Sequence, residues 1–196
     1  HSPPNKLDNK DINSIREVIN QELESEKIKK FGVSLKSPSD FKYFLDLFPE
    51  ISALQFNFNL IDQRAKDCGL LEYLSNSQTL GIARTPFVFG FLAKATKENL
   101  FGTNDHRKNW STEQINQWME SKNIFNELAK SLKLSITELA LNFCLSTPEV
   151  THVIPGMLNS SEIYSNMNTL LKPKLSLNQL TNIYDIYSKY DFRPKK

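Results

Sequence analysis

The sequence predicts an α/β fold built on a parallel β-sheet. Short apolar stretches alternate with longer amphipathic stretches along the chain, which is the pattern of strands joined by crossover helices. Pro86 and Pro155 follow two of the apolar stretches and end the strands predicted there. Because the chain has 196 residues, of which 39% are apolar, it can bury one substantial core, and we expect a single domain over 1–196.

The first part of the chain contains three helix and strand alternations. Apolar residues near one face predict a helix over 12–28, which leads into a strand at 31–34. Segment 37–48 opens with an N-cap serine, a proline at the first helical position and an acidic third residue, which together predict a helix. The next predicted elements are a strand at 53–58, a helix over 63–76 and a strand at 79–84.

The stretch 86–110 interrupts this alternation. It is rich in Phe, Gly and Asn and is too long for an ordinary connection, and such loops are usually functional or disordered. Beyond it, Ser111, Ser135 and Ser176 begin N-capping sequences, and Ser160 or Ser161 caps a shorter helix. The elements predicted there are helices over 111–132 and 135–145, a strand at 150–154, helices over 160–170 and 176–190, and a frayed tail at 191–196.

Composition excludes several classes of partner. The net charge of +2 comes from 24 basic and 22 acidic residues spread along the chain, so we expect no nucleic acid partner. No apolar run approaches the length of a membrane span, so we also expect no membrane partner. The three histidines have no metal-ligand spacing. Cys68 and Cys144 are far apart in predicted helices, which favours free thiols and a cytoplasmic protein.

Polar residues occur where the predicted strands end. Ligands of parallel α/β sheets gather at the carboxyl ends of the strands, and Ser34, Gln55 and Arg84 lie at three such ends. A buried strand would exclude Gln55 and Arg84 unless they were paired or lined a ligand cavity. Two other interpretations remain open on spacing alone, namely that Gln55 satisfies neighbouring backbone and that Arg84 forms a structural ion pair.

Five segments, taken in order, resemble the second half of an aldo-keto reductase, in the branch of the potassium-channel beta subunits and the bacterial general stress reductases. They are FGVSLKS at 31–37, LQFNFNLIDQRA at 54–65, GIARTPFVFGFLAKA at 81–95, DHRKNW at 105–110 and VTHVIPG at 150–156. The resemblance implies the C-terminal half of a TIM (β/α)8 barrel, with parallel strands 5–8 and extra C-terminal helices. It also implies hydride transfer between NAD(P)H and an aldehyde or ketone; the absence of a GxGxxG motif agrees with it.

The family's catalytic set is an Asp, a Tyr, a Lys and a His. The opening HSPP matches the end of the family's fourth strand, so the resemblance makes His1 the catalytic histidine and places the other three residues before it. We therefore expect the isolated chain to be inactive. Its expected partners are a small carbonyl substrate and either the missing N-terminal half barrel or a second copy of itself, which would cover two open sheet edges.

The resemblance also assigns the cofactor contacts. Ser34 and Gln55 would bind the nicotinamide carboxamide, although Leu35 stands where the family usually has Asn. Arg84 would stack beneath the nicotinamide in place of an aromatic ring. The pyrophosphate would lie on the backbone N–H groups of Thr85, Phe87 and Gly90, under the loop 86–110. At the adenosine end the expected contacts are Gly156, Glu162 and Asn166.

The adenosine end further suggests which cofactor is used. Met157 and Leu158 stand where NADPH-using relatives carry a cation for the 2′-phosphate, and Glu162 adds a carboxylate. Because a carboxylate repels a phosphate but accepts a hydrogen bond from a ribose hydroxyl, we expect NADH to be favoured.

Three alternatives stay open. The chain could be a non-catalytic half barrel that acts only as a binding or structural module. Within the family, it could serve isomerase or dehydratase-like chemistry, or a sugar-modifying reductase. A third alternative is copper chelation by the amine and imidazole of His1, which would need a second nearby histidine.

Overall fold

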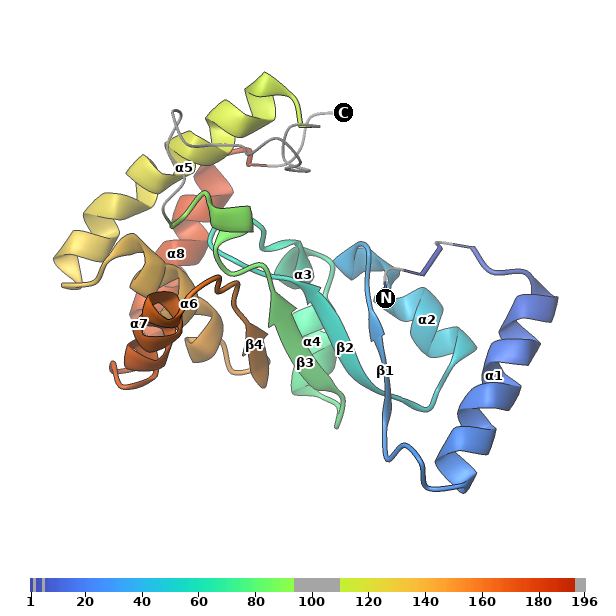
Figure 1. Ribbon diagram of the computed structural model, residues 1–196. Helices are drawn as coiled ribbons and strands as arrows, with labels where there is room; N and C mark the ends of the chain where they lie inside the picture. The colour runs from blue at the N-terminus through green and yellow to red at the C-terminus, as the bar shows by residue number, and fades with distance from the viewer. Residues whose placement is uncertain (2, 5, 94–109, 193–196) are drawn as a thin grey trace.

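A four-stranded parallel β-sheet forms the centre of the computed structural model, which describes residues 1, 3–4, 6–93 and 110–192 (Figure 1). The strands lie in chain order, and each is hydrogen-bonded in parallel to the next. They are β1 (Phe31–Ser34), β2 (Ile51–Asn57), β3 (Leu80–Arg84) and β4 (His152–Ile154). The predicted α/β class with a parallel sheet is therefore confirmed; its completion to a barrel stays a prediction.

Helices join the strands and cover one side of the sheet (Figure 1). In chain order they are α1 (Asn9–Glu24), the 3-10 turn η1 (Pro38–Asp40), α2 (Phe41–Leu47), α3 (Arg64–Asp67), α4 (Leu70–Ser75), the 3-10 turn η2 (Val88–Gly90), α5 (Thr112–Ser131), α6 (Ile136–Ser146), α7 (Ser160–Leu170) and α8 (Leu177–Lys189). The helix predicted over 63–76 is divided into α3 and α4, because Gly69 between them adopts a left-handed φ of 81°.

Serines stand at four of the helix starts. Ser37, Ser135 and Ser176 each form a capping box, in which the serine and the third helical residue bond each other's backbone N–H groups. Ser111 caps α5 by accepting a hydrogen bond from the backbone N–H of Gln114. The prediction that Ser160 or Ser161 caps α7 is wrong: the side chain of Asn159 is the cap, because its Oδ1 accepts from the backbone N–H of Glu162 at 3.0 Å.

The two faces of the sheet differ in burial. Leu54, Phe56 and Ala83 point to the helical side and are fully buried there. The opposite side carries no helix (Figure 1), and its residues lie in rows across the strands because the parallel register is regular towards the carboxyl ends of the strands. One row is Ser34, Gln55, Ile82 and His152, and the next is Asn57, Arg84 and Ile154. These residues are half-buried or exposed, so we call this side the open face.

Helix α7 presents an apolar face to solvent. Its exposed apolar residues have a spacing of one, four, seven and eight positions, which places them along one side of the helix. We call them the α7 stripe: Ile163, Tyr164, Met167, Leu170 and Leu171, which are between 45% and 83% exposed.

Several predicted absences concern the described part of the chain only. Within it, no helix is long and apolar enough to cross a membrane. No group of three or more His, Cys, Asp or Glu that could hold a metal ion occurs among the described residues. Cys68 and Cys144 are both free thiols, as the sequence predicts.

Candidate functional site

Ser34 and Gln55 meet at the carboxyl ends of β1 and β2. The register pairs them directly, and the Ser34 hydroxyl donates to Gln55 Oε1 at 2.9 Å. This hydrogen bond orients the amide, so Gln55 Nε2 remains as a donor while the serine oxygen keeps its acceptor capacity. A donor and an acceptor side by side on a half-buried surface can bind a carboxamide, which needs both. The structure thus brings together the two residues that the sequence pairs.

Arg84 at the end of β3 reaches across the sheet to β1. Its Nη2 donates to the backbone oxygen of Leu35 at 3.0 Å, while the Leu35 side chain is fully buried in the core. The Asn that Leu35 replaces in the family therefore has no polar equivalent here, and the position serves instead as an anchor for Arg84. Burial lowers the pKa of the Arg84 guanidinium. Its Nε is buried with no hydrogen-bond partner among the described residues.

The turn after β3 has an unusual backbone. Thr85, Val88 and Phe89 have φ values of 60°, 50° and 55°, and Gly90 has 95°. A left-handed conformation at a non-glycine residue costs about 1–3 kcal/mol and persists only where the surroundings hold it. The N–H groups of Val88 and Gly90 donate to the carbonyls of Thr85 and Phe87, so in this conformation the turn itself uses two N–H groups of the predicted anion-binding segment.

The remaining predicted contact in this turn is Phe87. Its side chain is 8% exposed and packs in the core, so only its backbone borders the strand end. Residues 94–109, which include most of the predicted covering loop and His106, lie outside the described residues.

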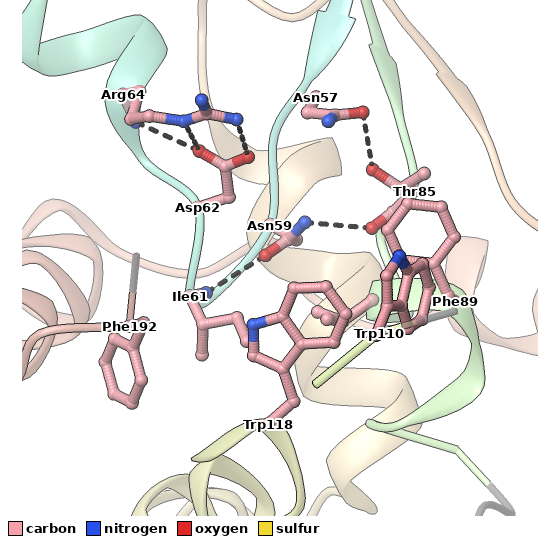
Figure 2. Close-up of a pocket in the computed structure, with 11 residues that line it drawn as sticks. Asn57, Asn59, Ile61, Asp62, Arg64, Thr85, Phe89, Trp110, Trp118 and Phe192 are labelled. Atoms are coloured by element: carbon pink, nitrogen blue, oxygen red, sulfur yellow. Dashed lines mark hydrogen bonds and ion pairs between the residues drawn. The ribbon is translucent and has the colours of Figure 1, made fainter. Parts of the chain in front are cut away.

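A cavity of about 180 Å³ adjoins Thr85 at the ends of β2 and β3 (Figure 2). Asn57 and Asn59 line it on one side, and the rings of Phe89 and Trp118 on another. Asp62 and Arg64 also line it and form a two-point ion pair, with Nε and Nη2 of Arg64 each 2.7 Å from an oxygen of Asp62. This pair raises the pKa of the Arg64 guanidinium, first through the hydrogen bond to Asp62.

The sequence alone assigns no role to the two asparagines in this cavity. The Thr85 hydroxyl donates to Asn57 Oδ1 at 3.0 Å, and Asn59 Nδ2 donates to the backbone oxygen of Thr85 at 3.0 Å (Figure 2). Asn59 is only 3% exposed. The one signal in the sequence is that both asparagines directly end or follow an apolar strand, where a polar side chain meets the ligand-binding edge of a parallel sheet.

The segment after β4 contains three predicted contacts. Gly156 is exposed, with open space around the position of a Cβ atom. The Glu162 carboxylate accepts from the backbone N–H of Leu158 at 2.8 Å, so it also fixes the loop that leads into α7. Asn166 is 8% exposed, and its Nδ2 has no hydrogen-bond partner among the described residues.

His1 is exposed in the structure. The segment after it is held by Leu7, whose backbone N–H donates to the Tyr43 hydroxyl at 2.8 Å. No hydrogen bond within the described part of the chain joins His1 to Ser34, Gln55 or Arg84, so its catalytic role stays a prediction.

Comparisons with known proteins agree in pointing to one family. The model of the Aldo/keto reductase family matches residues 1–188. Two curated relatives, the L-glyceraldehyde 3-phosphate reductases of Escherichia coli O157:H7 and Escherichia coli strain K12, are each 26% identical to this chain over 175 residues. That match covers 82% of this chain but 50% of each relative, so the chain spans about half the length of the curated relatives it matches.

Solved structures show the same fold at low identity. The glycerol dehydrogenase AKR11B4 from Gluconobacter oxydans superposes with a TM-score of 0.75 at 19% identity, covering 97% of this chain and 58% of that one. The aldo-keto reductase AKR11C1 from Bacillus halodurans superposes with a TM-score of 0.64 at 16% identity, covering 87% of this chain and 54% of that one.

Proposed function

Because this chain belongs to the aldo/keto reductase family, we propose that it forms the cofactor-binding part of an NAD(P)H-dependent oxidoreductase that acts on a small aldehyde or ketone. When bound, the nicotinamide dinucleotide would supply the hydride. Ser34 and Gln55 bind its carboxamide and so fix which face of the ring meets the substrate. Arg84 lies beside them at the next strand end, where its planar guanidinium can stack on the ring.

The observation that carries this proposal is a pair of unsatisfied donors. Buried donors without partners are rare, because each costs about 1–3 kcal/mol. Arg84 Nε and Asn166 Nδ2 are two such donors among the described residues, and the family resemblance independently assigns both side chains to the cofactor. The phosphates, the nicotinamide amide and the adenine of a dinucleotide all carry acceptors. The residues present therefore fit the group.

The proposal assigns His1 to the reaction itself. His1 would orient or polarise the carbonyl oxygen of the substrate, while an Asp, a Tyr and a Lys outside this chain complete the set. The 196-residue chain alone is then expected to show no carbonyl-dependent oxidation of NADH or NADPH. Turnover by the pure chain would contradict this division of roles.

We also propose that NADH is preferred over NADPH. Leu158 is 94% exposed at the point where a cation would meet a 2′-phosphate, and Glu162 places a carboxylate against the same loop. Glu162→Gln removes the charge but keeps an acceptor for the Leu158 N–H. This variant should bind NADPH more tightly while NADH affinity stays within about twofold, and an unchanged ratio of the two affinities would refute the preference.

Cofactor binding can be tested on the chain as it stands. Calorimetric titration with NADH and NADPH should give saturable binding, and Asn166→Leu or Arg84→Met should weaken it about tenfold by removing a donor. Gln114→Leu is the matched control, since Gln114 is also buried with an unpartnered side-chain atom but lies on α5. No saturable binding, or equal losses in all three variants, would overturn the proposal.

A partner follows from the same proposal. The α7 stripe, the β4 edge and the open face together form the surface that another four-stranded α/β unit would cover in a closed barrel. In the isolated chain, a second copy is the available substitute, so we expect concentration-dependent association and binding of a hydrophobic dye. Light scattering and dye fluorescence of Met167→Glu and Leu171→Glu should show both effects reduced. Leu177→Glu, an exposed apolar position on α8, is the control. A monomer that binds no dye would refute the proposal.

Two further points complete the proposal. The free thiols Cys68 and Cys144 support a reducing compartment, and we infer the cytoplasm. The alternative of a non-catalytic binding module predicts the same association but no dinucleotide binding, so the titration above separates the two.

A further inference from the structure

Two asparagines form hydrogen bonds to Thr85, the residue directly after β3. Asn57 is the last residue of β2, and its Oδ1 lies 3.0 Å from the Thr85 hydroxyl, which shares its one proton between this oxygen and the Arg84 carbonyl at 2.6 Å. Asn59 lies two residues further on, and its Nδ2 donates to the Thr85 carbonyl at 3.0 Å. One asparagine therefore binds the side chain of Thr85 and the other its backbone, as Figure 2 shows.

Asn59 is itself held rigidly. Its Oδ1 accepts from the backbone N–H of Ile61 at 3.1 Å, and its backbone exchanges two hydrogen bonds with that of Asp62, at 3.2 and 3.3 Å. The carboxylate of Asp62 is in turn fixed by Arg64 through two contacts of 2.7 Å. Because Asn59 is almost fully buried, its amide cannot exchange these partners for water.

The residue held in this way is the first of the left-handed residues in the turn. Thr85 has a φ of 60°, and Val88 donates its backbone N–H to the same Thr85 carbonyl that Asn59 binds, at 3.0 Å. The orientation of this carbonyl therefore sets the course of the chain from Arg84 to Gly90. On its other side, Arg84 is anchored to Leu35. The turn is fixed to β2 through Thr85 and to β1 through Arg84.

We propose that Asn57 and Asn59 are positioning residues for the cofactor: they act through Thr85 by fixing where the turn 85–90 leaves the strand end at which a dinucleotide would bind. This inference rests on the proposed function. It adds two residues that need not contact the cofactor, and it explains what keeps the turn in its left-handed backbone conformation. Without the two asparagines the turn would leave its left-handed backbone conformation. Cofactor binding would then have to restore that conformation, which would weaken the affinity for the cofactor.

The test measures dissociation constants for NADH and NADPH together with the free energy of unfolding. Thr85→Val, which removes the hydroxyl, and Asn57→Ala should each weaken binding about tenfold, whereas Thr85→Ser, which keeps the hydroxyl, should restore wild-type affinity. Thr85→Val removes the hydroxyl contacts to both Asn57 and the Arg84 carbonyl, whereas Asn57→Ala removes only the first, so the double variant should bind about as weakly as Thr85→Val alone. Asn59→Asp, which replaces the donor to Thr85 with a carboxylate oxygen that repels the Thr85 carbonyl, should weaken binding by at least as much.

Ser135→Ala is the control, because it removes the cap of α6 and destabilises the fold without removing a hydrogen bond of Thr85, Asn57 or Asn59. Its dissociation constants should equal those of the wild type. If the wild type binds and Asn57→Ala and Thr85→Val bind within twofold of it, or if Ser135→Ala loses as much affinity as they do, the positioning role is refuted while the proposed function survives. If the wild type binds neither dinucleotide, the proposed function falls and this inference falls with it.

Discussion

Gly81 allows β4 to lie close to β3, and an added methyl group there should destabilise the protein strongly. An ideal Cβ atom on Gly81 would lie 2.3 Å from the backbone oxygen of Glu149 and 2.9 Å from a methyl carbon of Leu74. Real Cβ atoms almost never approach another atom closer than 3.0 Å, so the segment before β4 would have to move by about 0.7 Å, the difference between 3.0 and 2.3. The obstructing atom belongs to the backbone and cannot rotate away.

Overpacking of this kind costs about 1–3 kcal/mol, and for a backbone clash we take the upper value of about 3 kcal/mol. At an unfolding entropy of about 2.1 cal/mol/K per residue, a chain of 196 residues has about 0.4 kcal/mol/K, so Gly81→Ala should lower the melting temperature by about 7 °C.

Two other glycines provide the controls. Gly156 has no atom within 4 Å of an added Cβ, so Gly156→Ala should stay within about 0.5 kcal/mol of the wild type. Gly69 has the same open space but a φ of 81°, so Gly69→Ala should cost about 1 kcal/mol through its backbone alone. Urea and thermal unfolding followed by circular dichroism measure all three. Equal stability of Gly81→Ala and Gly156→Ala would show that the close approach of β4 is not real.

Three other predictions concern side chains away from the sheet edge. Burial raises the pKa of the Cys144 thiol, and the Cys144 sulfur lies 3.3 Å from the Phe58 carbonyl oxygen. A maleimide at pH 7.5 should therefore label at most Cys68 in the native chain and both thiols in urea. Rapid labelling of Cys144 in the native chain would contradict its burial. Burial raises the pKa of Tyr187 to about 12, above the ordinary value of about 10, so the stability linked to it is fully present below pH 10 and lost as the pH rises towards 12. Tyr187→Phe should flatten this part of the curve in urea midpoints taken at pH 9 and 11.5, and a parallel curve would refute the linkage. Loss of the α6 cap in Ser135→Ala should cost about 1 kcal/mol of unfolding free energy, and a neutral result would mean that the capping box contributes nothing in solution.

Much of the fold follows from local signals in the sequence. β1 spans the predicted residues, and α5, α6 and α8 lie within one residue of their predicted bounds at both ends, because apolar periodicity and serine caps are determined by neighbouring residues. The first helix, predicted over 12–28, lies three to four residues earlier at Asn9–Glu24. Two other errors arise where neighbouring residues compete for one role. Asn159 outcompetes the serines that follow it as the cap of α7, and Gly69 divides one amphipathic pattern into two helices.

Within the candidate site, the contact that could be predicted is one between residues in the same row of the sheet. Ser34 and Gln55 could be paired because parallel strands align their carboxyl ends, and the structure shows them in direct contact. The hydrogen bond from Asn59 to Thr85 could not be predicted, since the two residues are 26 positions apart and their contact depends on the left-handed φ of Thr85. A contact that depends on tertiary geometry in this way produces no periodic pattern in the sequence.

The short outer strands have a consequence for how the chain behaves at high concentration. β1 has four residues, with a register shift between Phe31 and Gly32, and β4 has three. Growth of amyloid-like fibrils needs a long, flat edge that offers an unbroken series of backbone groups to the next molecule. Edges this short can add a matching strand but offer little template for indefinite addition. We therefore expect any association of this chain to stop at small complexes.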